Sequence, residues 1–154
     1  MRAALFAILL LSAVPALAKD DCVIDSGPND IVKKSGDIVI EAGQVVEDVI
    51  TLNGTVTIKS GATVKSAISM HGNVIIEDGG TVKKSALSVG GTVMRSKGSS
   101  VNGTIEISDK GLKVRGEGGD DVDLNIVIGG KSLGQRIADE ALAKLKNCRI
   151  AAAK

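Results

Sequence analysis

GDIVIEAGQVVEDVITLN (36–53), GTVTIKSGATVKSAISMH (54–71) and GNVIIEDGGTVKKSALSV (72–89) follow one another without a gap and repeat one pattern every eighteen residues. A fourth copy, GTVMRSKGSSVNGTIEI, begins one residue late at Gly91. The delay is an insertion at the Lys83/Lys84 pair, because KSAISMHG (65–72) and KSALSVGG (84–91) then match almost letter for letter. Self-similarity at a short fixed period indicates a repeat architecture.

Apolar residues occupy alternate positions within each repeat, which predicts β-strands rather than helices. Glycines recur at two corners, where the chain must bend sharply. These features predict a mainly β fold, a single-stranded β-solenoid whose coils stack at about 4.8 Å. We expect about five coils, counting partial coils from Ile31 and through Ile128, with right-handed winding favoured over left-handed winding. Five apolar columns are expected to face the core: Ile38/Val56/Val74/Val93, Ile40/Ile58/Ile76, Val46/Val64/Val82/Val101, Ile50/Ile68/Leu87/Ile105 and Leu52/Met70/Val89/Ile107.

The chain divides into four segments. Residues 1–18 read as a signal peptide, with Arg2, an apolar run and the small-residue exit Ala16-Leu17-Ala18. Residues 19–35 form an amino-terminal segment, 36–128 the solenoid domain, and 129–154 a carboxyl-terminal helix and tail. The apolar run is too short to cross a bilayer, so no membrane insertion is expected. The sequence therefore predicts a periplasmic or secreted protein.

Composition narrows the classes of partner. Of 19 basic and 18 acidic residues only Arg2 leaves with the signal, so the mature chain is formally neutral and offers no attraction to nucleic acid. Phe6 is the sole aromatic residue and also lies in the signal, so the mature protein has no ring on which a base could stack. No nucleic-acid partner is expected.

Two cysteines, Cys22 and Cys148, lie near the ends of the mature chain. In an oxidising compartment they are expected to form one disulfide, which by the chain-entropy model stabilises the fold by up to about 5 kcal/mol. Two buried, unpaired thiols are the alternative.

The repeats resemble those of bactofilins, polymer-forming bacterial cytoskeletal proteins built as small right-handed β-helices. The resemblance lies in the sequence pattern G-x-V-x-I-x-x-G-A-x-V of GTVTIKSGATV and in its relatives GNVIIEDGGTV and GDIVIEAGQVV. The resemblance covers roughly Ile31 to Ile107. It implies a scaffold that polymerises end to end without nucleotide. The signal peptide and the terminal cysteines depart from the family pattern, so this chain would be an exported variant.

The segment after Ile128 predicts an amphipathic helix. Ser132 and Gln135 have capping-box spacing, and one helical face carries five apolar residues: Leu133, Ile137, Ala141, Leu142 and Leu145. From Leu133 to Asn147 the helix would be about 22 Å long, close to five coils at about 4.8 Å. We expect it to run back along the solenoid, bring Cys148 to Cys22, and dock on an apolar outward column: Val39, Thr57, Ile75 and Met94.

Four features could carry chemistry. His71 lies at a corner, where it is either an exposed turn residue or the base of an acyltransferase-like site. The segment Gly116–Leu124 reads as an acidic loop leading into a strand from Leu124 to Ile128, or as a lone calcium-binding turn. Arg95 interrupts an aliphatic column, so either the strand is shifted there or the core is open to solvent. Outward hydroxyl groups could form an ice-binding wall or simply face solvent, and they belong to Thr55, Thr57, Thr63, Thr81, Ser69 and Ser88.

These observations favour a non-enzymatic structural or scaffold protein of the cell envelope, without cofactor or metal. Self-association is expected through the solenoid ends, whose strand edges can pair with another chain. Val39, Ile75 and Met94 are the expected interaction surface. The alternatives are a β-helix module that binds calcium, glycan or ice, and, less favoured, a hexapeptide-repeat acyltransferase-like enzyme.

Overall fold

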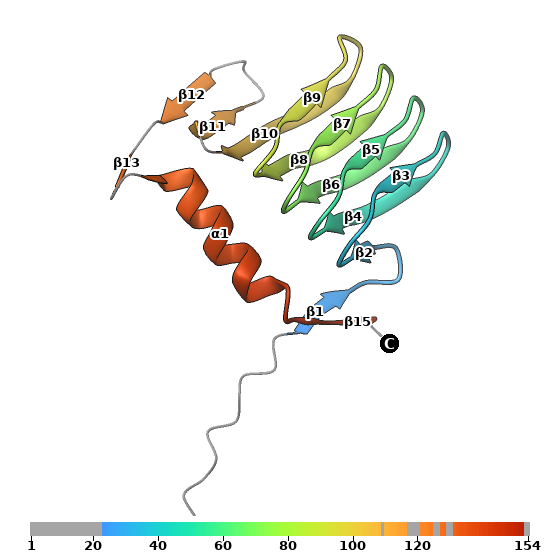
Figure 1. The fold of residues 1–154 in the computed structure, drawn as a ribbon. Coiled ribbons are helices and arrows are strands. Elements are labelled where there is room, and N and C mark those ends of the chain that lie inside the picture. The colour runs from blue at the N-terminus through green and yellow to red at the C-terminus, as the bar shows by residue number, and fades with distance from the viewer. Residues whose placement is uncertain (1–22, 109, 117–120, 125–126, 129–130, 153–154) are drawn as a thin grey trace, which may run out of the picture.

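The computed structural model describes residues 23–108, 110–116, 121–124, 127–128 and 131–152. The signal peptide and Cys22 lie outside these residues. The structure is a β-solenoid of stacked parallel coils followed by one helix (Figure 1). Its elements, in chain order, are β1 (Val23–Ser26), β2 (Ile31–Lys33), β3 (Ile38–Ile40), β4 (Val45–Thr51), β5 (Val56–Ile58), β6 (Thr63–Ser69), β7 (Val74–Ile76), β8 (Thr81–Val89), β9 (Val93–Arg95), β10 (Ser100–Ser108), β11 (Gly111–Arg115), β12 (Asp121–Leu124), β13 (Val127–Ile128), β14 (Lys131–Ser132), α1 (Leu133–Leu145) and β15 (Arg149–Ala152).

Each coil contributes one short strand and one long strand, so the stack has two walls. The short sheet has four parallel strands in the order β3-β5-β7-β9, and the long sheet has seven in the order β12-β11-β10-β8-β6-β4-β2. Strand partners are one repeat apart, as in Val56 with Val74 and Val64 with Val82. The predicted solenoid is confirmed with about four coils, to which β2 adds a partial coil at the amino-terminal end.

The expectation of a further partial coil through Ile128 is wrong. After β10 the chain reverses, and β11 and β12 extend the long sheet in antiparallel fashion. The predicted strand from Leu124 to Ile128 is instead the end of β12 and the separate short strand β13. Repeat-like apolar columns stop at Ile107 in the sequence, and the parallel stacking stops with them.

The insertion at Lys83/Lys84 appears as a register shift between neighbouring long strands. Val64 pairs with Val82, eighteen residues on, whereas Ala67 pairs with Ala86, nineteen residues on. The β10 strand lacks the extra residue, and its pairing with β8 shifts back between Val101 and Gly103. A local bulge absorbs the insertion, and the coils on either side keep their stacking.

Glycines make both kinds of corner possible. In the turns that follow the short strands, Gly43, Gly61 and Gly79 have φ values of 80°, 76° and 79°, a region that residues with a Cβ rarely adopt. At the other corner consecutive coils come so close that a Cβ on Gly72 would collide with the carbonyl of Gly54.

Only three of the five predicted columns face the main core, and the reason lies within the long strands. In β4 the buried positions are Val46, Val49 and Thr51, so two residues separate the first pair and one separates the second. This break in alternation turns the fourth and fifth predicted columns to the outside. The main core consists of the first three columns together with Ala62, which precedes β6, and three residues of the long strands: Val49, Ala67 and Ala86.

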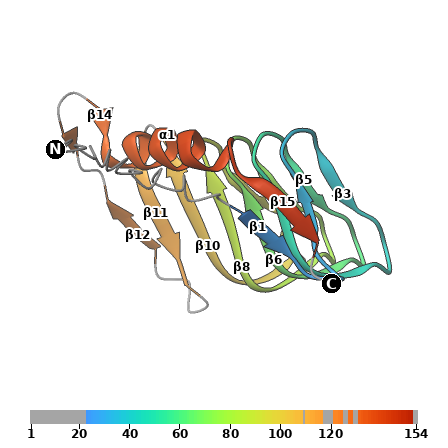
Figure 2. The ribbon, with the colours of Figure 1, turned by 90° about the horizontal axis from the view of Figure 1, so that it is seen from below.

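The displaced columns build a second core under the helix. Leu52, Met70 and Val89 are its buried centre. Around them pack partly buried residues of three segments of the chain: Ile24, Ile50, Ile68, Leu87, Ile107, Ala141, Leu142 and Leu145. The protein thus has an apolar core inside the coils and a smaller one between the outside of the long sheet and α1 (Figure 2).

Candidate functional site

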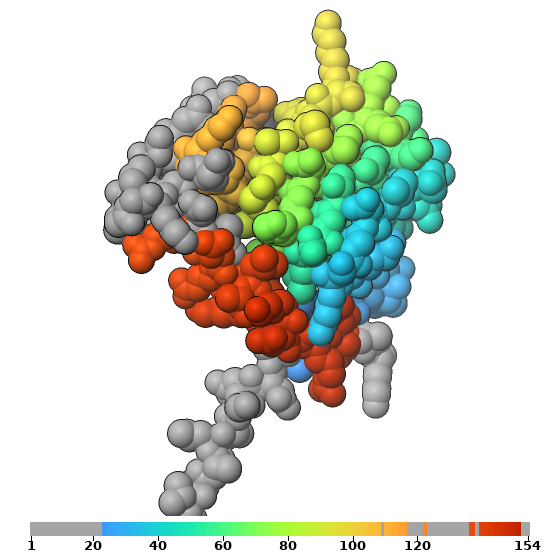
Figure 3. All heavy atoms as spheres, viewed as in Figure 1, coloured from blue at the N-terminus to red at the C-terminus, as the bar shows by residue number. Residues whose placement is uncertain are grey.

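The helix runs back along the stack, as the sequence predicts, but on the other wall. It begins after the antiparallel strands, contacts β10 and β11, and leads to β15 at the amino-terminal end of the solenoid (Figures 1 and 2). In the space-filling view its residues lie along the flank of the coils (Figure 3). The expected docking on Val39, Thr57, Ile75 and Met94 is therefore wrong. The second core offers a continuous apolar surface, which the outer face of the short sheet does not.

The expected interaction surface remains uncovered among the described residues. Val39 and Met94 are 44% and 43% exposed, and Ile75 is half-buried. Strand register places them in one column, in the order Val39, Thr57, Ile75 and Met94. The structure therefore brings these predicted residues together on one outer wall, and no described segment of the chain lies over them.

The first and last strands of the described chain pair beside the partial coil. Strand β1 pairs with β15 in parallel, with Val23 opposite Arg149 and Ser26 opposite Ala152. Ser26 also donates a hydrogen bond from Oγ to the carbonyl oxygen of Ala151, at 3.2 Å. Cys148 is fully buried and immediately precedes β15, while Cys22 immediately precedes β1 and lies outside the described residues. The pairing of the two cysteines stays a prediction.

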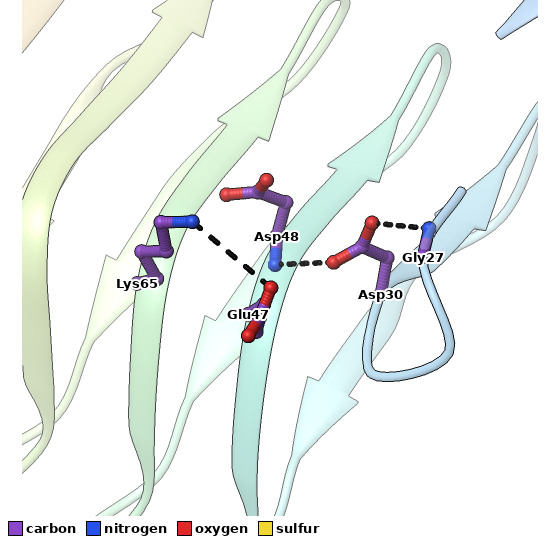
Figure 4. A network of polar contacts seen from close by, with 5 residues as sticks. All are labelled: Gly27, Asp30, Glu47, Asp48 and Lys65. Atoms are coloured by element: carbon purple, nitrogen blue, oxygen red, sulfur yellow. Dashed lines mark hydrogen bonds and ion pairs between the residues drawn. The ribbon is translucent and has the colours of Figure 1, made fainter. Parts of the chain in front are cut away.

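Asp30 ties the amino-terminal turn to the first full coil (Figure 4). Its Oδ2 accepts a hydrogen bond from the backbone N–H of Gly27 at 2.6 Å, and its Oδ1 accepts one from the N–H of Asp48 at 3.0 Å. Asp48 lies where the alternation of β4 breaks, so the carboxylate satisfies a backbone donor at that irregularity. Nearby, Glu47 and Lys65 form an ion pair at 4.0 Å across neighbouring coils.

A row of buried hydroxyl groups lies along the inner side of the glycine corner. Thr51, Ser69 and Ser88 are fully buried and donate to the carbonyl oxygens of the corner glycines, at 3.0, 2.7 and 2.8 Å: Gly36, Gly54 and Gly72. Ser69 and Ser88 were expected among the outward hydroxyls of an ice-binding wall, and that expectation is wrong. These hydroxyls have a structural role, because a buried hydroxyl group needs a hydrogen-bond partner and each of these links its strand to a corner.

His71, the sole histidine, is exposed at the corner between β6 and β7, as the turn interpretation predicts. Its ring makes no hydrogen bond to a described residue, whereas a general base needs a positioned partner within hydrogen-bond reach. In the part of the chain that the structure describes, no three His, Cys, Asp or Glu residues come together as a group that could hold a metal ion. Residues 117–120 of the predicted acidic loop lie outside that part.

The carboxyl-terminal end of the solenoid contains a polar pocket. Ile76 pairs with Arg95, so the strand is not shifted there, and Arg95 is exposed because the core opens at this coil. The pocket has a volume of about 250 Å³ and is lined by residues of both sheets: Val93, Arg95, Thr104, Glu106, Lys113 and Arg115. Glu106 is held in place by accepting a hydrogen bond at Oε1 from the N–H of Val93, at 2.7 Å.

The pocket arises from the end of the repeat pattern. Arg95 occupies the column that holds fully buried isoleucines in the earlier coils, and Glu106 follows Ser88 in its own column. On β11, Lys113 lies opposite Glu106 and Arg115 lies opposite Thr104. The sequence signal for Arg95 was a charge in an aliphatic column. Lys113 and Arg115 carried no such signal, because they lie beyond the repeats.

Comparisons with models of protein families, with curated proteins and with solved structures found no match to this chain. No helix among the described residues is both long and apolar enough to cross a membrane.

Proposed function

We propose that this protein is a non-enzymatic structural scaffold that is exported to the cell envelope or beyond. It acts as a discrete monomeric rod, in which the chain returns from one end of the stack to the other. The observation that carries the proposal is the path of the chain. Helix α1 runs back along the outer wall of the stack, and β15 then pairs with β1 at the opposite end from β12. With six strand spacings of about 4.8 Å, the long sheet gives the rod a length of about 29 Å.

The strand pairing at the ends of the long sheet favours a discrete monomer. It argues against the end-to-end polymer that the bactofilin resemblance implies. A second copy continuing the coils would place one strand beside β9 and another beside β10. The free side of β10 is already paired with β11, and at the other end β4 is paired with β2. The strands left at the ends are short: β2 and β12 of the long sheet have three and four residues, and β3 and β9 of the short sheet have three each.

The size of the exposed wall of the short sheet also argues against a stable dimer. Four strands of three residues cover about 19 by 10 Å, roughly 190 Å², whereas a stable interface buries about 800 Å² on each partner. We therefore propose that Val39, Ile75 and Met94 make a small contact with a short apolar segment of another envelope component.

We also propose a Cys22–Cys148 disulfide, which would link the segments before β1 and β15 covalently. Support comes from the register of β1 with β15, in which Val23 lies opposite Arg149, so the residues that precede these two strands are Cys22 and Cys148. The complete burial of Cys148 agrees with a structural role for its sulfur. A bridge between such distant residues would remove a large amount of entropy from the unfolded chain.

The test is the size distribution of the purified chain from Lys19 to Lys154, measured by sedimentation velocity and negative-stain microscopy with and without reductant. We expect a single species of monomer mass under both conditions. Filaments or large assemblies would overturn the discrete rod and favour the polymer. Non-reducing electrophoresis and intact mass, with Cys148→Ser as the control, test the disulfide separately.

A further inference from the structure

We propose that the open carboxyl-terminal end of the solenoid binds a small multivalent oxyanion of the phosphate or polycarboxylate class, held between Arg95 and Lys113. This site goes beyond the scaffold role and does not depend on it. The pocket volume of about 250 Å³ is slightly below the range of about 300 to 1,000 Å³ typical for drug-sized ligands. It therefore suits a small anion better than a large organic molecule.

The first argument is the position of two cations on opposite walls. Arg95 belongs to β9 at the end of the short sheet, and Lys113 belongs to β11 in the long sheet, yet both line one pocket. Neither forms an ion pair or side-chain hydrogen bond with a described residue. Lys113 lies opposite Glu106 in the strand register, but their charged groups do not come within 4.0 Å of each other. Both side chains are therefore available to form ion pairs with a bound anion.

The second argument is that an arginine occupies a position at which an aliphatic residue would favour stability. Ile40, Ile58 and Ile76 fill the same column in the preceding coils and are fully buried. An isoleucine at position 95 would extend the core by one more coil. Positions where a local rule is broken without structural gain are frequently functional.

The remaining charged groups define the selectivity of the pocket. Glu106 adds one negative charge, so the cations must be bridged by a ligand with enough negative charge to offset it. Arg115 already takes part in an interaction, and the proposal does not use it. Because the charge of Glu106 must be offset, a singly charged anion such as chloride should compete poorly.

The probes are inorganic phosphate and citrate, titrated into the mature chain by isothermal calorimetry at low ionic strength. The mature chain has no aromatic residue, so calorimetry replaces fluorescence. We expect saturable binding of at least one probe, weakened by added sodium chloride because salt screens charges. The stronger probe separates a phosphate site from a carboxylate site. Absence of saturable binding of both probes at millimolar concentration overturns the proposal.

Four variants test the residues. Arg95→Ile and Lys113→Ala should each weaken binding about tenfold or more, the value of a hydrogen bond to a charged group. Glu106→Gln keeps an oxygen for the N–H of Val93 and removes the negative charge, so binding should tighten several-fold. Lys97→Ala removes an exposed cation that does not line the pocket and should leave binding unchanged.

Arg95→Ile also separates the loss of a ligand contact from the loss of the folded structure. It should raise the thermal midpoint, since it adds an apolar residue to an aliphatic column, while it weakens binding about tenfold or more. Unchanged binding in this variant, or an equal loss in Lys97→Ala, would show that the pocket does not hold the anion.

Discussion

Ser69→Ala is expected to destabilise the solenoid although the substitution removes a single oxygen. The hydroxyl of Ser69 is fully buried and donates to the carbonyl oxygen of Gly54 at 2.7 Å. Alanine would remove this partly buried hydrogen bond, whose net contribution to the free energy of unfolding is about 1 kcal/mol. Alanine is accommodated sterically, so the cost measures the hydrogen bond rather than a clash.

Urea unfolding followed by far-ultraviolet circular dichroism measures this effect, because the method needs no aromatic residue. With a denaturant slope of about 1 to 3 kcal/mol per molar, the midpoint should fall on the order of 1 M. Ser66→Ala is the matched control on the same strand, since Ser66 is half-exposed and its hydroxyl has no hydrogen bond to a described residue. The control should change stability by less than about 0.5 kcal/mol. Equal midpoints for the two variants would refute the structural role of the hydroxyl row.

Two further substitutions test the helix. Leu142→Lys should detach α1 by placing a charge in the second core. The backbone amides of α1 should then lose protection from hydrogen exchange, while those of β5 and β7 keep theirs. The control is Ile137→Lys, at a position that is 41% exposed, and it should leave both sets of amides protected. Lys144→Ala should raise the pKa of Glu140, because the 2.8 Å hydrogen bond from Lys144, then its charge and that of Arg136, hold this pKa below its ordinary value. Carboxyl-carbon NMR titration measures the change. Because folding lowers the pKa of Glu140, its ionised form adds a small stabilisation to the folded state. This stabilisation is present above the unfolded-state pKa and is lost as the pH falls through the folded-state pKa. The Lys144→Ala variant should lose this pH dependence of stability.

The coil period, the strands and the helix could be predicted because each leaves a hydrophobic signal. Isoleucine and valine recur every eighteen residues, and their columns in the short strands match the buried positions. An irregularity at Arg95 was also predictable, because a charge interrupts a column that is otherwise aliphatic, but the sequence left open whether the strand is shifted or the core opens, and the structure shows the second. Here the sequence pattern and the burial follow the same physical preference, the removal of apolar surface from water.

The sides of the long strands could not be predicted from hydrophobicity. Their inner columns carry Val49, Ala67 and Ala86, then Thr51, Ser69 and Ser88, which are small or polar, whereas the larger Ile50 and Ile68 face outward to meet the helix. Simple alternation assigns the larger residues to the core and therefore places the helix on the wrong wall. The inner hydroxyl groups are satisfied by glycine carbonyls of the corners, a contact that only the folded coil creates.

Closure of the chain also explains how near-identical coils keep their register. In a stack of similar repeats, a strand could pair with the next coil but one and still meet valine and isoleucine columns. Such a skip would shorten the distance between the ends by about 4.8 Å. Helix α1 has a fixed length, with β10 and β11 at one end and the β1–β15 pair at the other. A stack missing a coil could not bring Arg149 opposite Val23 while Leu142 and Leu145 remain in the second core, so the helix and the terminal pair together select the correct number of coils.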